Sequence, residues 1–173
     1  MLTRMLTLIL VTSCLLGVMP RAFAQAPSAQ SAEFSFRALD GPAVTSESLR
    51  GEVVVLAFGA SWLPLTRNQM EGLKKLADQY AGRGVAVYWV STESDSAKSK
   101  NFADDNQLRE LGRRYKTTVL RDPDGTISKR LGVDQLPSTV IINKQGQVAA
   151  TVSGLDPNAD VAKQLSDQLA KIL

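Results

Sequence analysis

The spacing of apolar residues predicts alternating strands and helices along most of the chain. Two continuous apolar runs, Val53 to Phe58 and Val85 to Val90, are typical of strands that are buried on both faces of a sheet. Between these runs, apolar residues recur every three or four positions, which predicts an amphipathic helix from Pro64 to Tyr80 that ends at Gly82. Residues 34–38 alternate between apolar and polar, as expected of a strand with one buried face.

The rest of the chain adds shorter elements of both kinds. A short strand and one helical turn are expected within residues 44–49, and a closing hairpin turns at Asn143 to Gly146. The other elements, each placed by its apolar pattern and flanking turn residues, are a broken helix over 97–115, a strand over 117–121, a helix over 127–131, strands over 139–142 and 148–152, and a last helix that starts within 156–160. Because strands that alternate with helices favour a parallel core, and the hairpin is antiparallel, the sequence predicts an α/β fold with a mixed central sheet flanked by helices.

The first 24 residues have the three parts of a secretory signal peptide. Arg4 gives a positive start, Met5 to Val18 is apolar, and Ala22-Phe23-Ala24 is a cleavage site of the A-x-A type. The apolar part is shorter than the ~20 residues that a transmembrane helix needs. We therefore expect cleavage after Ala24, a mature protein without a transmembrane segment, and a periplasmic or secreted location.

A lipoprotein signal is the alternative interpretation of this segment. Val11 to Cys14 resembles a lipobox that would be acylated at Cys14, although the apolar run continues to Val18, where a lipoprotein usually turns polar. The residues that follow the signal, 25–32, are small and polar and predict a flexible linker. One domain is then expected over residues 33–173.

Composition limits the chemistry that remains after cleavage. Cys14 is the single cysteine, and the chain has no histidine. A protein that begins at Gln25 has neither thiol nor imidazole, so it forms no disulfide and offers no Cys or His to zinc or copper. Loss of Arg4 and Arg21 leaves 18 basic against 17 acidic residues, which lowers the net charge from +3 to +1. We expect no cofactor, no metal and no nucleic-acid partner.

Two long segments resemble one protein family over nearly the whole mature chain. FSFRALDGPAVTSESLRGEVVVLAFGASWLPLTRNQM and VLRDPDGTISKRLGVDQLPSTVIINKQGQV are similar to the TlpA/ResA-like thioredoxins of the redoxin superfamily. The first segment aligns with the family motif F-x-A-[ST]-W-C-x-x-C-R, and the second has its D-P-D-G turn and G-V-x-x-x-P loop. The resemblance implies a thioredoxin-like fold with an N-terminal β extension, thiol-disulfide oxidoreductase chemistry and a role in cell redox homeostasis.

The resemblance also places the family's two redox cysteines at Leu63 and Thr66, so the CxxC motif is degenerate. Leu63 has no nucleophile, and Thr66 has a hydroxyl but no histidine to activate it. We expect Thr66 to cap backbone N–H groups of the first helical turn, and we predict no catalytic residue. Ala57 stands where thioredoxins carry a buried carboxylate, and Pro137 stands where the family has a cis-proline.

The same resemblance outlines a groove for an extended polypeptide. In the family, the cis-proline loop lends backbone groups to a bound peptide, a form of strand addition. Here Trp62, Leu63, Leu65, Leu136 and Pro137 would surround that groove. The alternative is that Trp62 and Leu65 partly pack inward and that only Leu63 is exposed.

We therefore predict an exported thioredoxin-fold pseudoenzyme that acts as a binding or accessory module for an unidentified polypeptide of the cell envelope. The alternative function is that of a thiol-disulfide oxidoreductase or redoxin in cell-envelope redox or cytochrome c maturation, which rests on the fold resemblance. A peroxiredoxin-like enzyme lacks support on the same grounds, because the T-x-x-C nucleophile of that family is absent.

Two further groups of charged residues have simpler explanations than a site. Arg109, Arg113, Arg114 and Lys116 form a basic cluster that predicts a solvated helix face rather than an anion site. The two acids of the turn Asp122 to Gly125 are expected from the Asp-Pro-Asp-Gly turn itself, without catalysis.

Overall fold

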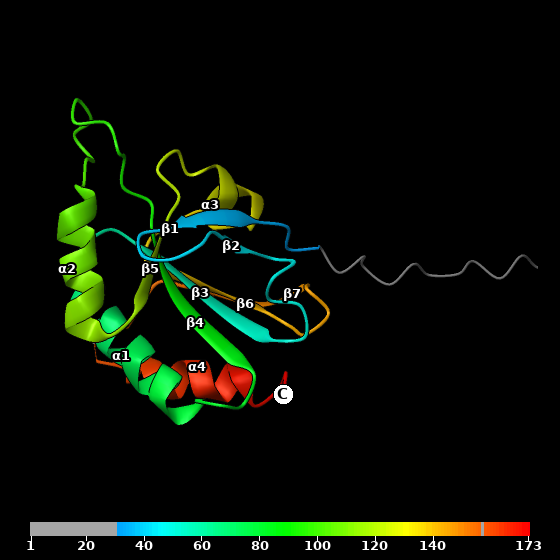
Figure 1. Ribbon diagram of the computed structural model, residues 1–173. Coiled ribbons are helices and arrows are strands. Elements are labelled where there is room, and N and C mark those ends of the chain that lie inside the picture. Colours follow the sequence, from blue (N-terminus) through cyan, green and yellow to red (C-terminus); the bar gives the residue numbers. More distant parts are fainter. Residues whose placement is uncertain (1–30, 157) are drawn as a thin grey trace, which may run out of the picture.

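The computed structural model describes residues 31–156 and 158–173, which are built around one central sheet (Figure 1). The predicted signal peptide, its cleavage site at Ala24 and the alternative acylation site at Cys14 lie outside the described residues. Their roles remain predictions from the sequence.

Seven strands form the sheet, in the spatial order β2-β1-β5-β4-β3-β6-β7. β3, β4 and β5 run parallel, and the other neighbouring pairs are antiparallel. The strands are β1 (Ser35–Ala38), β2 (Val44–Thr45), β3 (Val53–Gly59), β4 (Val85–Ser91), β5 (Thr118–Arg121), β6 (Ser138–Ile142) and β7 (Val148–Ser153). The mixed α/β sheet is therefore confirmed, with β1 and β2 as its N-terminal extension and β6 and β7 as its closing hairpin.

Four helices cover the two faces of the sheet. α1 (Thr66–Gln79), α2 (Asp105–Tyr115) and α4 (Val161–Leu169) contribute to one core, whereas α3 (Thr126–Arg130) lies on the opposite side of the sheet, near β1 (Figure 1). None of the helices in the described part of the chain is both long and apolar enough to cross a membrane.

The continuous apolar run of β3 is explained by burial on both sides. Val53, Val55 and Ala57 point into the core under α1, α2 and α4. The alternate residues of β3 point into the second core, which also holds Phe34 and Phe36 of the N-terminal extension. A strand at the centre of a two-sided core shows no alternation of polarity, which is why the pattern predicted it correctly.

Two helices begin later than predicted. The helix expected from residue 97 begins only at Asp105, because Asp104 forms a capping box: its side chain accepts from Asn106 N–H, and its own N–H donates to Gln107. α1 begins at Thr66 rather than Pro64, after a tight loop.

The domain also begins earlier than the predicted linker allows. Ala32 is buried, and its N–H donates to Gly146 O at 2.9 Å. Ser31 forms a β-bridge with Gln147. The last two residues of the expected linker therefore pack against the β6–β7 turn.

Candidate functional site

The predicted site residues come together at one edge of the sheet. The loop of residues 60–65 joins the end of β3 to α1. β6 runs antiparallel to β3, with Phe58 opposite Ser138, so the residues before Ser138 lie beside the start of this loop. The peptide bond between Leu136 and Pro137 is cis, as the resemblance implied.

The exposed fractions of these side chains show which of them reach the surface. Trp62 is 64% exposed, so the alternative in which it packs inward is wrong. Leu136 is 36% exposed, and Leu63 and Leu65 are half-buried, but Pro137 is buried and adds little to the surface. Trp62 and Leu136 are thus the exposed members of the predicted groove, and the groove itself stays a prediction.

Thr66 does not cap the helix, contrary to the prediction. It is the first residue of α1, only 3% exposed, and its hydroxyl donates to Ala60 O at 2.6 Å. The residue at the cap position, Leu65, has no side-chain bond to the helix. The hydroxyl of Thr66 therefore closes the β3–α1 loop instead, together with the bond from Leu63 N–H to Ala60 O at 3.1 Å.

The described part of the chain offers the site neither a thiol nor an imidazole. Residues 31–156 and 158–173 include no cysteine and no histidine. No cluster of three or more potential metal ligands occurs among these residues either. Ala57, at the position of the thioredoxin carboxylate, is fully buried in the apolar core.

A buried carboxylate that sequence reasoning missed lies directly beneath the loop. Glu93 is 1% exposed and accepts two hydrogen bonds from Ser61: the N–H at 2.9 Å and the hydroxyl at 2.7 Å. The hydroxyl of Ser91 donates to the same carboxylate at 3.0 Å. Glu93 thus fixes both the backbone and the side chain of the residue before Trp62.

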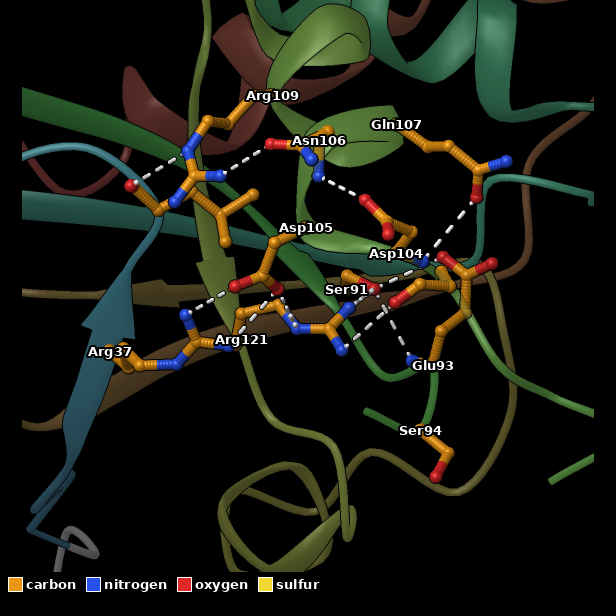
Figure 2. A network of polar contacts seen from close by, with 12 residues as sticks. Arg37, Ser91, Glu93, Ser94, Asp104, Asp105, Asn106, Gln107, Arg109 and Arg121 are labelled. Atoms are coloured by element: carbon orange, nitrogen blue, oxygen red, sulfur yellow. Dashed lines mark hydrogen bonds and ion pairs between the residues drawn. The ribbon is translucent and has the colours of Figure 1, made fainter. Parts of the chain in front are cut away.

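This carboxylate belongs to a wider polar network around Arg121 (Figure 2). The buried guanidinium of Arg121 donates to Ser91 Oγ at 3.2 Å and to Ala103 O at 3.4 Å, and its Nε lies 3.5 Å from Asp105 Oδ1. Burial lowers the pKa of Arg121, while the nearby Asp105 carboxylate opposes this shift. Asp105 also accepts two hydrogen bonds from Arg37, which lower the pKa of the carboxyl.

The side chain of Trp62 forms a hydrogen bond that the sequence did not predict. Its indole Nε1–H donates to Asn101 Oδ1 at 2.8 Å, and Asn101 Nδ2 in turn donates to Thr92 O at 3.4 Å. The position of Glu93 and Asn101 after β4 could have indicated that they lie near Trp62. The parallel strands β3 and β4 end at the same edge of the sheet, with Gly59 opposite Ser91. Loops that follow the carboxyl ends of parallel neighbours meet there.

The remaining charged residues lie away from this edge or have structural roles. Arg109 donates to Leu39 O and is 3.4 Å from Asp40, and Arg113 pairs with exposed Glu110. Arg109, Arg113 and Lys116 line a hollow of about 240 Å³. The carboxylate of Asp40 lines the same hollow and faces these basic side chains. The turn acid Asp122 is buried and accepts the N–H groups of Ile127 and Ser128, as a structural cap of α3.

Comparison with protein families and characterised sequences places the chain among redoxins. Residues 26–151 match the AhpC/TSA family. The thiol-disulfide oxidoreductase ResA of Bacillus thuringiensis subsp. konkukian is 27% identical over 134 residues, which span 78% of this chain and 71% of that protein. The thiol:disulfide interchange protein DsbE of Pseudomonas aeruginosa is 28% identical over 145 residues, which span 80% and 75% of the two chains.

Solved structures confirm the thioredoxin-like fold. A structure assigned as the thiol:disulfide interchange protein DsbE of Chlorobium tepidum superimposes with a TM-score of 0.69 at 22% identity, over 83% of this chain and 96% of that one. A secreted disulfide oxidoreductase of Mycobacterium tuberculosis, homologous to Escherichia coli DsbE, gives a TM-score of 0.65 at 23% identity, over 81% and 96%.

Proposed function

Because the chain belongs to the AhpC/TSA family, and because it is related to thiol-disulfide oxidoreductases, we propose that it is an exported member of this group that has lost thiol chemistry and binds an extended polypeptide of the cell envelope. The proposal is carried by the β3–α1 loop, where the resemblance aligns Leu63 and Thr66 with the family's two redox cysteines. Export rests on the N-terminal signal sequence described above.

The state of Thr66 supports a loss of chemistry. A resolving residue must supply a thiol, whereas Thr66 supplies only a hydroxyl, and this hydroxyl donates to Ala60 O within the loop. Its pKa is too high for an unassisted nucleophile, and no histidine is available to it anywhere in the chain. The side chain serves the structure of the loop.

The surface beside this loop supports a polypeptide ligand. Trp62 and Leu136 are exposed apolar residues at this edge, and the loop adds half-buried Leu63 and Leu65. The backbone N–H and C=O of Leu136 bond to no other residue in the described ranges, so they are available to an added strand. Strand addition combines such backbone bonds with contacts to alternate side chains.

Titration with a short labelled peptide, in which threonine alternates with valine or leucine between acidic ends, tests this function. We expect wild-type protein to bind it and a matched peptide with prolines at the polar positions to bind far less, because proline lacks the N–H. Leu63→Asp should weaken binding about thirtyfold, the equivalent of losing one anchor of ~2 kcal/mol.

The controls separate binding from folding. Ala149→Asp adds the same charge to an exposed residue at the far end of β7 and should leave both affinity and thermal midpoint unchanged. If Leu63→Asp lowers the midpoint strongly, Leu63 is part of the core, and Trp62→Ala then tests the surface through its most exposed side chain. Equal binding of both peptides, or no binding by wild type, would overturn the proposed function.

A thiol-disulfide oxidoreductase is the second candidate, and the names of the relatives favour it. It requires a redox group that the mature chain does not contain, because the only cysteine is Cys14. Insulin reduction with dithiothreitol, measured against a no-protein control, decides between the two: we expect no rate above the control.

A further inference from the structure

We infer that the segment after β4, residues 92–101, is the second half of the recognition surface, and that Glu93 and Asn101 are positioning residues that hold Trp62 ready for its partner. This inference rests on the proposed function for the identity of the partner, but the holding of Trp62 rests on the contacts of the loop alone.

The first support for Trp62 is the hydrogen bonding of the residue that precedes it. Ser61 precedes Trp62, and both its N–H and its hydroxyl are fixed by the buried carboxylate of Glu93, at 2.9 and 2.7 Å. Glu93 is itself held by Ser91, and Ser91 accepts a hydrogen bond from buried Arg121. The path of the chain into Trp62 is therefore set by a network that is rooted in β4 and β5, of which Figure 2 shows Ser91, Glu93 and Arg121.

The second support acts on the indole ring. The Nε1–H of Trp62 donates to Asn101 at 2.8 Å, although the side chain is 64% exposed. An exposed tryptophan that follows a fixed residue and is bonded at the single polar atom of its side chain is preorganised, and this reduces the conformational entropy that binding would otherwise cost. Large aromatic side chains are also the residue type that most often dominates an interface.

The hydrogen bond to Asn101 also limits which groups of the partner can contact the indole of Trp62. Because the only donor of the indole is already used, the partner meets the ring carbons and not the N–H. A cation could stack on such a ring, but exposed Lys98 and Lys100 lie next to Asn101 in the chain and form no ion pair with any described residue. Exposed Asp95 lies in the same segment, so its charges do not select an acidic partner, and the ring carbons favour an apolar side chain.

Relaxation of the 15N-labelled indole groups tests the positioning without any partner. We expect the order parameter of the Trp62 indole to be near the rigid value of about 0.85 in wild type and to fall below about 0.6 in Asn101→Ala. Asn106→Ala, which removes an exposed amide bonded to Arg109, is the matched control and should change nothing at Trp62. Asn101→Asp keeps the acceptor oxygen and should keep the indole rigid.

Binding of the alternating peptide gives the second readout. Asn101→Ala and Glu93→Gln should each weaken it about two- to tenfold, the range expected for ordering a free side chain, whereas Asn101→Asp stays near wild type. A lysine in place of the central leucine of the peptide should reduce binding to wild type. A mobile wild-type indole, or an Asn101→Ala variant that keeps both rigidity and affinity, would refute the positioning role. A rigid indole in a protein that binds no peptide would refute the partner instead, and leave the positioning role supported.

Discussion

Gly59, the last residue of β3, is a position where one methyl group would disturb the support of the candidate site. A Cβ atom there would lie 2.8 Å from Gln69 Oε1 and 2.9 Å from Trp89 Nε1, two atoms that share a buried hydrogen bond of 2.9 Å. Gln69 and Trp89 are fully buried, so neither can move aside freely. We expect Gly59→Ala to lower the free energy of unfolding by about 1–3 kcal/mol, the usual cost of overpacking, as measured by urea denaturation.

A second variant checks that the clash is the cause. Gln69→Ala removes the nearest of the two atoms, so the loss in the double variant Gly59→Ala/Gln69→Ala should be smaller than the sum of the single losses. Losses that simply add would contradict this account.

At the scale of the elements, α3 depends on a side chain that precedes it. Asp122 is 1% exposed and accepts the N–H of Ile127 at 3.2 Å and of Ser128 at 2.7 Å, while Gly125 at the cap position offers no side chain. Asp122→Ala leaves two helix N–H groups without an acceptor. Since bonds to a charged group are the stronger ones, we expect the free energy of unfolding to fall by about 2 kcal/mol or more in urea denaturation.

The same turn provides the matched control. Asp124 is exposed and accepts the N–H of Thr126 at 3.1 Å, and hydrogen bonds from Thr126 lower the pKa of its carboxyl. Asp124→Ala should cost clearly less than Asp122→Ala. An equal effect of the two substitutions would mean that burial of Asp122 plays no part.

For the molecule as a whole, we expect the fold to support thiol-disulfide chemistry once two cysteines are placed in the β3–α1 loop. Leu63 and Thr66 stand at the start of α1, where a helix N-terminus lowers the pKa of a thiol. Leu63→Cys with Thr66→Cys is therefore expected to form a disulfide under oxidant and to gain insulin reduction with dithiothreitol. Mass spectrometry with thiol alkylation reports the bond, and insulin turbidity reports the activity.

Single-cysteine variants are the controls for this test. Leu63→Cys alone offers a nucleophile without a resolving partner, so it should form mixed disulfides but give no turnover. A double variant that stays unbridged under oxidant would show that residues 63 and 66 do not correspond to the family's cysteines.

The sequence by itself determined the order and type of nearly all elements, because burial leaves a local trace. The two-sided burial of β3 and β4 appears as unbroken apolar runs, and the turn residues bound the short elements. It also determined which chemistry is missing, since composition alone excludes thiol and imidazole from residues 31–156 and 158–173. The family resemblance and the cis bond before Pro137 followed from contiguous motifs.

Only the tertiary structure decided which side chains meet. The D-x-x-Q spacing of Asp104 and Gln107 marks the start of α2 in the sequence, but only the structure shows that the capping box forms there and not nearer residue 97. Thr66 closes a loop rather than capping a helix, and Glu93 and Asn101 support Trp62 from a different loop. The physical reason is the parallel register of β3 with β4, which brings the ends of two separate strands to one edge. Periodicity within one element reports what is buried, whereas contacts between elements are set by the pairing of the strands that carry them.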